Sequence, residues 1–236
     1  MNQKTAIITG CTKGIGLAIA VQFANMGFNI AGCARNLSDL EGLKHLLQAT
    51  NTGAKHTLLQ VDVSKKEDVL AFAEEVKNTY KSIDVLVNNA GVFIPGKIAE
   101  EADNTLEHLL NTNLISAYYL TKSCLPAMVN QNSGHIFNIC SIASLQAYEG
   151  GGSYAISKFG LLGFSKQLRH ELKNTGIKVT AVMPGATLTN SWAGVDLPET
   201  RFIKPEDIAK TIQAVYELSS YTDVEEIVIR PQAGDI

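Results

Sequence analysis

A tyrosine and a lysine are spaced in this sequence so that they could move a proton together. Tyr154 and Lys158 are four residues apart in an amphipathic stretch, and this spacing puts both on one face of a helix. A free tyrosine has a pKa of about 10, too high for ready proton exchange near neutrality. An ammonium about 4 Å away contributes roughly 4 kcal/mol at an effective dielectric constant near 20, or about three pKa units. We therefore expect Lys158 to lower the pKa of Tyr154, which could then act as a general acid or base on a bound ligand.

A glycine-rich loop is the second chemical signal. Residues 9–16 read T-G-C-T-K-G-I-G, follow an apolar run and lead into a helix that we expect to end near Met26. Glycines let the backbone turn tightly and approach a pyrophosphate, and a helix N-terminus offers free N–H groups and a positive dipole end. The alternative is an ordinary strand–helix turn. The position of the loop directly after the first strand favours a dinucleotide site.

Short apolar runs alternate with longer amphipathic stretches along the whole chain. Near-continuous apolar runs imply strands buried on both faces, which is typical of a parallel sheet between helices. We predict a single domain, 1–236, with a three-layer Rossmann fold: a doubly wound, mostly parallel, seven-stranded sheet with helices on both faces. The predicted strands are 4–9, 28–33, 57–61, 83–87, 134–140, 177–183 and 225–229.

Right-handed crossovers put the C-terminal ends of such strands at one edge of the sheet. The loops after residues 9, 33, 61, 87, 140 and 183 should therefore share a ligand-binding rim. The segment 187–204 has no strong periodicity before the next helix, and we interpret it as a substrate loop or lid.

Composition narrows the class of protein. The net charge of −3, with 18% charged residues, gives no support for nucleic-acid binding. The sequence contains no run of 18 or more apolar residues, which a membrane-spanning helix would require. The N-terminus lacks the pattern of a secretion signal, so we expect a cytoplasmic protein. The four cysteines are far apart and the histidines are not clustered, which argues against a metal site.

Three motifs together resemble one enzyme family. The G-x-x-x-G-x-G spacing of residues 10–16, the N-N-A-G turn at 88–91 and the Tyr-x-x-x-Lys pair are similar to those of short-chain dehydrogenases/reductases, in particular NADP-type members like 3-oxoacyl-ACP reductases. The resemblance runs from Thr5 to about Val228. It implies an oxidoreductase that transfers a hydride between a nicotinamide dinucleotide and a carbonyl compound or secondary alcohol.

The resemblance also assigns roles to residues. Ser141, thirteen residues before Tyr154, and Asn113, twenty-eight before Ser141, complete the family's Asn-Ser-Tyr-Lys tetrad. Ser141 would orient the substrate oxygen, Lys158 would also hold the nicotinamide ribose, and Asn113 would support Lys158 through a water. The predicted cofactor contacts are Thr9, Gly10, Thr12, Lys13, Gly14, Ile15, Gly16, Arg35, Asn36, Asp62, Val63, Asn89, Ala90, Gly91, Tyr154, Lys158, Pro184, Gly185, Thr187 and Thr189.

The end of the second strand indicates the choice of cofactor. Ala34 stands where an NAD-binding protein usually has an acid, and Arg35 follows it. Arg35 and Lys13 could flank a 2′-phosphate, so NADP(H) is favoured over NAD(H), unless Arg35 is only a solvated surface charge. Asp62 either contacts the adenine or caps a helix.

The substrate is less well defined. A mixed pocket could be lined by Phe93, Ala143, Gln146, Tyr148 and Trp192, although each could equally serve packing. A 3-oxoacyl thioester, a small ketone or aldehyde, or a sugar-like alcohol would all be compatible. The resemblance implies a homodimer or homotetramer built through helices near 104–130 and 152–173, while the departure from relatives at 225–232 puts the usual tetramer geometry in question.

Two other functions are compatible with the same fold. A catalytically silent dinucleotide-binding regulator would be expected to have lost part of the tetrad, which is complete here. An epimerase or dehydratase would reuse the tyrosine but usually needs a larger substrate domain. A serine hydrolase is disfavoured because the sequence has no G-x-S-x-G motif.

Overall fold

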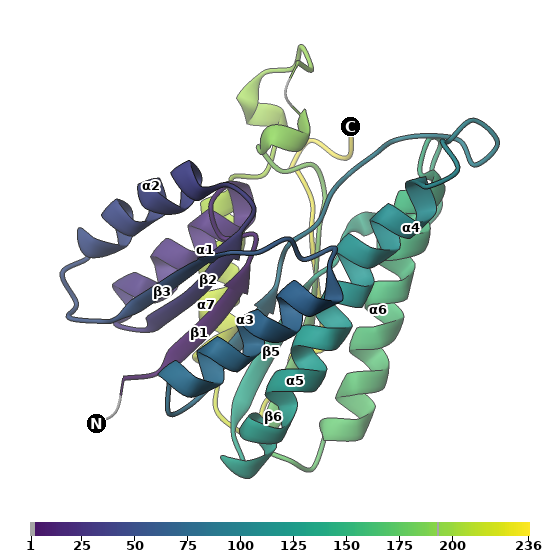
Figure 1. Cartoon of the computed structure of the whole chain (residues 1–236). Helices are drawn as coiled ribbons and strands as arrows, with labels where there is room; N and C mark the ends of the chain where they lie inside the picture. The colour runs from purple at the N-terminus through teal and green to yellow at the C-terminus, as the bar shows by residue number, and fades with distance from the viewer. Residues whose placement is uncertain (1–2, 193) are drawn as a thin grey trace.

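The computed structural model describes residues 3–192 and 194–236 and contains one seven-stranded sheet (Figure 1). The strand order is β3-β2-β1-β4-β5-β6-β7, and every neighbouring pair is parallel. The predicted Rossmann fold is confirmed, and each strand lies within two residues of its predicted bounds. The strands are β1 (Thr5–Thr9), β2 (Asn29–Ala34), β3 (His56–Gln60), β4 (Val85–Asn88), β5 (Gly134–Ile139), β6 (Ile177–Pro184) and β7 (Glu226–Ile229).

Helices cover both faces of the sheet. On one face α1 (Gly14–Asn25), α2 (Leu37–Gln48) and α7 (Pro205–Tyr216) pack on a core that includes Phe23 and Ile208. On the other face α3 (Lys66–Thr79), α5 (Ser116–Asn130) and α6 (Gly152–Leu172) pack on a core that includes Phe72 and Leu168, and α4 (Thr105–Leu110) lies against α6 (Figure 1). Burial on both sides explains the continuous apolar strands.

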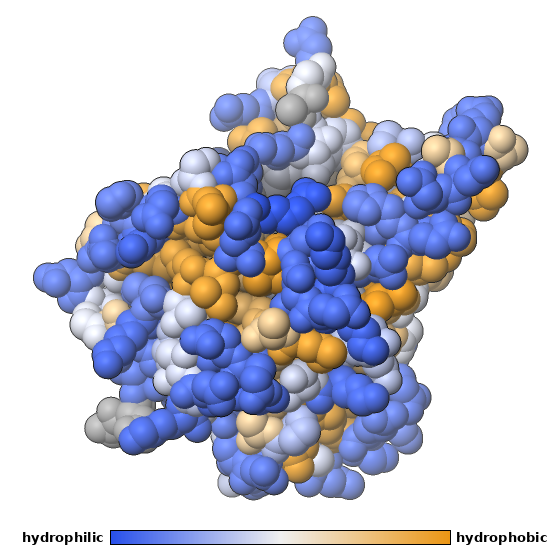
Figure 2. Space-filling view, viewed as in Figure 1, coloured by the Kyte–Doolittle hydropathy of each residue, from blue (hydrophilic) through white to orange (hydrophobic). Residues whose placement is uncertain are grey.

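The sheet order reverses at β1, which creates the crevice where such folds bind ligands. After β3 the chain returns to the other side of β1 to form β4, so the loops that follow β1 and β4 diverge at the C-terminal edge of the sheet. In Figure 2, which has the same view as Figure 1, polar residues cover most of the visible surface and apolar residues gather in the middle, between α2 and α3.

The helix starts differ in how their first N–H groups are satisfied. The side chain of Asn36 caps α2 by accepting a hydrogen bond from the Ser38 N–H at 2.9 Å. Helix α7 begins with Pro205 and has acidic residues in its first turn, both common at helix starts. In contrast, α1 has no side-chain cap and no acidic residue in its first turn. Its first N–H groups are therefore available to an anionic ligand.

The predicted lid, 187–204, contains two single-turn helices, η3 (Asn190–Trp192) and η4 (Glu199–Arg201). Thr187 and Ile203 pair in a parallel bridge, which fixes the two ends of the segment beside each other. Ala193, which belongs to this predicted segment, lies outside the described residues. Opening and closing of the segment stay a prediction.

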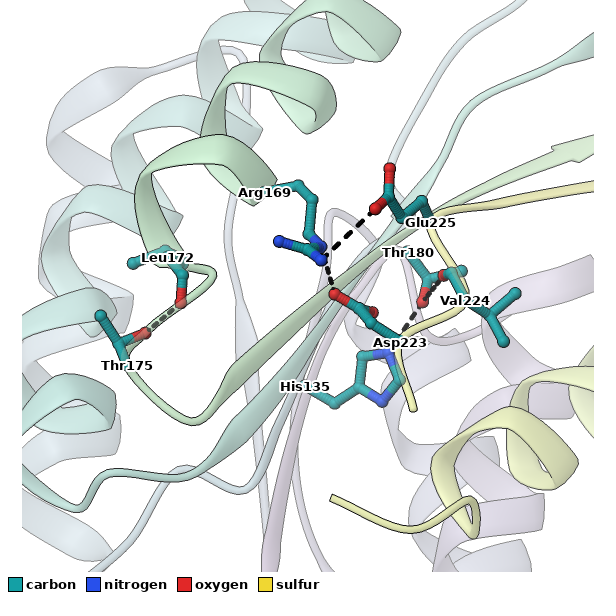
Figure 3. A network of polar contacts seen from close by, with 8 residues as sticks. All are labelled: His135, Arg169, Leu172, Thr175, Thr180, Asp223, Val224 and Glu225. Atoms are coloured by element: carbon teal, nitrogen blue, oxygen red, sulfur yellow. Dashed lines mark hydrogen bonds and ion pairs between the residues drawn. The ribbon is translucent and has the colours of Figure 1, made fainter. Parts of the chain in front are cut away.

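A polar network ties the sheet together at the edge opposite the motif-bearing loops (Figure 3). His135, near the start of β5, pairs through Nε2 with the Thr180 hydroxyl on β6 at 2.8 Å, and Thr180 donates to the Val224 carbonyl at 2.6 Å. Arg169 of α6 forms ion pairs with Asp223 and Glu225. The network joins β5, β6 and α6 to the segment that leads into β7.

Candidate active site

The loops at the C-terminal edge of the sheet enclose one large cavity of about 830 Å³. Its lining includes most of the residues predicted from the sequence, and they come from loops that are far apart along the chain. The predicted residues that line it are Gly10, Thr12, Lys13, Gly14, Ile15, Arg35, Asn36, Asp62, Val63, Asn89, Ala90, Gly91, Phe93, Ser141, Ala143, Gln146, Tyr148, Tyr154, Lys158, Pro184, Gly185, Thr187, Thr189 and Trp192.

Tyr154 and Lys158 lie on the side of α6 that faces this cavity. The ring of Tyr154 meets the ring of Phe93 edge-on, with 4.8 Å between their centres. Lys158 is only 5% exposed, and its ammonium donates a hydrogen bond to the carbonyl of Ile139, the last residue of β5, at 2.8 Å. The end of β5 therefore fixes the lysine, and it also carries the chain directly to Ser141.

The pKa of Tyr154 corrects one expectation. Burial raises the pKa of Tyr154 to about 12, and the hydrogen bond with Ser141 acts in the opposite direction. Lys158 does not lower the tyrosine pKa as predicted, because its ammonium bonds to Ile139 and lies 5.9 Å from the centre of the tyrosine ring. Burial also lowers the pKa of Lys158 to about 8. Desolvation is thus the largest influence on the pKa of both groups.

Ser141 is held by its own short turn. It caps the single-turn helix η2 (Ile142–Ser144), where its hydroxyl oxygen accepts a hydrogen bond from the Ala143 N–H at 3.1 Å and the Ser144 hydroxyl accepts one from the Ser141 N–H at 3.2 Å. This reciprocal pair fixes the serine backbone at the cavity wall. Ser141 and Tyr154 line the same cavity.

Asn113 lies behind the cavity wall, in a turn that the sequence pattern did not reveal. Residues Asn111–Ile115 form a π-helical turn between α4 and α5, a widened turn that is frequent at functional sites. The Asn113 side chain accepts a hydrogen bond from the Val92 N–H at 2.8 Å and donates to the Val92 carbonyl at 3.0 Å and to the Ser157 hydroxyl at 2.9 Å. It therefore fixes α6 against the loop after β4, beside Lys158.

The glycine loop turns as its sequence predicts. Gly10 and Gly14 have φ values of 63° and 52°, a region that favours glycine. A side chain at Gly16 would come within 2.2 Å of the Gly10 carbonyl oxygen, so this glycine allows α1 to pack against the loop. The Thr9 hydroxyl accepts hydrogen bonds from the N–H groups of residues 89 and 90 at 3.0 and 2.9 Å. Thr9 and Gly16 thus shape the cavity from behind and do not line it.

The adenosine end of the cavity contains a carboxylate that the sequence analysis did not identify. Asp39, in the first turn of α2, pairs with Lys13 at 2.8 Å and lines the cavity together with Arg35. Asp62 accepts hydrogen bonds from the Ser64 N–H at 3.1 Å and the Ser64 hydroxyl at 2.8 Å, so it stabilises the turn ahead of α3 while it lines the cavity. Asp62 does not cap α3, whose N-cap residue is Lys65, without a side-chain capping bond. A contact between Asp62 and the adenine stays a prediction.

The opposite end is walled by aromatic residues and by the last residues of the chain. Phe93, Tyr148 and Trp192 line it, and so do Asp235 and Ile236, for which the sequence offered no signal. The Arg201 guanidinium of η4 donates to the carbonyls of residues 233 and 235, at 3.0 and 3.3 Å. The segment after β7 is thereby tied to the predicted substrate loop and completes this wall.

Within residues 3–192 and 194–236, no group of three or more His, Cys, Asp or Glu side chains is arranged to hold a metal ion. Over the same residues, no helix combines the length and apolar character needed to cross a membrane.

Comparison with known proteins gives consistent matches over nearly the whole chain. The family model described as short chain dehydrogenase matches residues 4–199. Sepiapterin reductase of Chlorobaculum tepidum is 35% identical over 98% of this chain and 97% of that protein. An alcohol dehydrogenase from the archaeon Thermococcus sibiricus, complexed with 5-hydroxy-NADP, superposes with a TM-score of 0.90 at 27% identity, covering 98% of this chain and 97% of that one. L-Sorbose reductase from Gluconobacter frateurii, complexed with NADPH and L-sorbose, superposes with a TM-score of 0.89 at 29% identity, covering 98% of this chain and 96% of that one.

Proposed function

This chain belongs to the short chain dehydrogenase family and is an oxidoreductase, and from that premise we propose that it reduces a small carbonyl compound with NADPH, using Tyr154 as the proton donor. One observation carries the proposal. A single cavity joins the uncapped N-terminus of α1 at one end to Tyr154, Ser141 and Lys158 at the other. An anion-binding helix start and a proton-transfer group in one enclosure are what a nicotinamide-dependent reductase requires.

The residues present fit a dinucleotide. The glycines at 10 and 14 keep side chains away from the start of α1, where a Cβ at Gly14 would come within 2.8 Å of Thr189. Lys158, the N-N-A-G turn, Thr187 and Thr189 all border the same cavity. When bound, the nicotinamide cofactor supplies the hydride.

The chain's own groups handle the proton. Because burial raises the pKa of Tyr154 to about 12, its hydroxyl is protonated at neutral pH and can donate to a carbonyl oxygen. Ser141 would orient that oxygen from the neighbouring wall, and Lys158, fixed by the Ile139 carbonyl, would hold the cofactor ribose beside the tyrosine. Asn113 holds the loop that follows β4 against α6.

The preference for NADP(H) rests on the charges at the adenosine end. Arg35 and Lys13 both line the cavity there, and Ala34 provides no carboxylate to repel a 2′-phosphate. The solved structures of the alcohol dehydrogenase and the L-sorbose reductase contain NADP-type cofactors. Asp39 neutralises part of the charge on Lys13. Arg35 would then be the principal phosphate ligand.

The deciding experiment is a substrate panel followed by NADPH absorbance, run with wild type and with Tyr154→Phe. The panel contains sepiapterin, L-sorbose, 2,3-butanedione and acetoacetyl-CoA, which represent a heterocyclic ketone, a sugar, a small ketone and a 3-oxoacyl thioester. We expect wild type to reduce at least one of them, and we expect Tyr154→Phe to lose about 10²- to 10⁴-fold in rate while it still binds NADPH. Equal turnover by the two proteins would refute the mechanism.

We also propose a cytoplasmic homo-oligomer. Apolar side chains are exposed on the outer sides of α5 and α6, including Tyr118, Ile156 and Phe159, each more than 40% exposed. An exposed apolar group of this kind favours association through these two helices. The four cysteines are free thiols, which suits a reducing compartment. Light scattering on the purified chain would distinguish a dimer from a tetramer, and a monomer at micromolar concentration would contradict the proposal.

A further inference from the structure

A carboxylate from outside the helix caps the start of α6. Glu101 lies in the segment between β4 and α4, 52 residues before Ser153. Its Oε1 accepts a hydrogen bond from the Ser153 N–H at 2.9 Å, and its Oε2 accepts one from the Ser153 hydroxyl. Ser153 is only 3% exposed. This contact lies outside the tetrad and the cofactor residues described above.

Helix α6 needs such a partner because it supplies none of its own. Its N-cap residue, Gly151, makes no side-chain capping bond, and its first turn contains no acidic residue. The first N–H groups of a helix have no partner inside the helix, and they carry the positive end of its dipole. The Glu101 carboxylate satisfies both requirements, although it comes from another segment of the chain.

The surrounding backbone leaves room for this carboxylate. A Cβ at Gly152 would lie 2.0 Å from Oε1 of Glu101 and 2.6 Å from the Gly96 carbonyl oxygen. The Gly96 N–H in turn donates to the Gly150 carbonyl at 2.9 Å. Glycine at 152, with φ at 37°, therefore allows the loop after β4 to lie directly against the start of α6.

The contact bears directly on Tyr154, which is the third residue of α6 and lies in its first turn. Asn113 holds the same loop at Val92, and between Val92 and Glu101 the loop carries Phe93, whose ring packs on that of Tyr154. The loop is thus fixed at both ends around the tyrosine. Lys158, one turn further along, is fixed separately by the Ile139 carbonyl.

We propose that Glu101 is a positioning residue that holds the first turn of α6 so that the Tyr154 hydroxyl meets the substrate oxygen. The inference rests on the proposed reductase function. Because Lys158 and the glycine loop have their own anchors, loss of the carboxylate should displace the proton donor and leave the cofactor site in place. The rate of proton transfer should fall, and the affinity for the cofactor should stay the same.

The test compares Glu101→Ala, Glu101→Gln and Glu100→Ala, measured with NADPH and the panel substrate that wild type reduces fastest. Glu100 is the matched control, an exposed carboxylate next to Glu101. We expect Glu101→Ala to lower kcat roughly 10- to 100-fold, since small misplacements of a reacting group have costs of that order. The Kd for NADPH and the KM for the carbonyl substrate should stay within about twofold of the wild-type values. Glu101→Gln, which keeps an acceptor for the Ser153 N–H, should recover much of kcat, and Glu100→Ala should match wild type.

A solvent deuterium isotope effect provides a readout that a general loosening of the fold would not produce. It should be larger in Glu101→Ala than in wild type, because proton transfer becomes the slow step. If that variant does not fold, Ser153→Ala removes one of the two hydrogen bonds and should lower kcat a few-fold with the NADPH Kd unchanged. An unchanged kcat in both variants, or a loss of NADPH affinity as large as the loss of kcat, would overturn the inference. Tyr154→Phe in the same assay separates the two proposals: if it is as active as wild type, the reductase mechanism itself fails.

Discussion

Acid should destabilise this protein through His135, the buried imidazole of the network in Figure 3. His135 is 1% exposed, and burial, assisted by the positive charge of Lys178, lowers its pKa to about 3. In an unfolded chain the pKa of histidine is about 6.5. Between these two values the unfolded chain binds a proton that the folded chain does not. Stability is therefore fully present above pH 6.5 and falls as the pH drops through this window.

The size of the effect follows from the shift. Each pKa unit corresponds to 1.36 kcal/mol, so the whole shift would cost about 5 kcal/mol near pH 3. At pH 5.0, only the part of the window above that pH contributes, about 2 kcal/mol. Asp223 acts in the opposite direction, because burial raises its pKa and its stabilising effect declines as pH rises. A variant that removes only the imidazole separates the two contributions.

The assay is urea denaturation at pH 7.5 and pH 5.0 for wild type, His135→Gln and His45→Gln. Glutamine can keep a hydrogen bond with the Thr180 hydroxyl but does not titrate, whereas His45 is exposed on α2. The loss in unfolding free energy between the two pH values should be about 2 kcal/mol smaller in His135→Gln than in wild type. His45→Gln should behave as wild type does. An equal loss in all three proteins would refute the reasoning.

Three further predictions concern the active site. Gly16→Ala should abolish NADPH binding, measured by calorimetry, because its Cβ would lie 2.2 Å from a backbone oxygen of the glycine loop; tight binding would contradict this packing argument. Gly163→Ala, whose Cβ would meet no atom within 4 Å, should raise the unfolding free energy by about 0.5–1 kcal/mol, measured by thermal melts. Asp39→Asn should tighten NADPH binding about two- to fivefold relative to NADH by freeing the lysine paired with it, and an unchanged ratio of the two Kd values would show that this lysine does not contact the phosphate. Because the pKa of Tyr154 is raised to about 12, carbonyl reduction should proceed at neutral pH and alcohol oxidation should accelerate as pH rises. Steady-state rates in both directions from pH 6 to 10 test this, and oxidation that slows with pH would exclude the tyrosine as its base.

The sequence was sufficient to predict the sheet and its functional edge. Apolar runs such as Ile7–Ile8 are buried on both sides, and that environment leaves a local signal because consecutive residues in the middle of the strand must be apolar. The glycine loop was equally readable, since a left-handed turn at Gly10 and close packing at Gly16 restrict the residue type at each position. The Tyr154 and Lys158 pair was recognisable because its helical spacing coincides with the positions of Ser141 and Asn113, which together match the family's tetrad.

Contacts between distant segments could not be read in this way. Nothing near Lys13 in the sequence indicates its pairing with Asp39, and nothing in the last residues indicates that Asp235 lines the cavity, because both depend on how separate loops meet. The same holds for the Glu101 carboxylate on α6. Such contacts join segments with no shared periodicity, so they leave no local pattern.

The pKa of Tyr154 shows most clearly what the sequence determines and what only the tertiary structure decides. Residue spacing along the chain determined that the tyrosine and Lys158 share a helix face, and from this the sequence predicted a lowered pKa. Only the tertiary structure decided the sign, because desolvation is summed over all surrounding atoms and the lysine bonds instead to the Ile139 carbonyl. Local pattern thus identified the chemical groups of this protein, and packing set their protonation, their partners and the walls of the cavity around them.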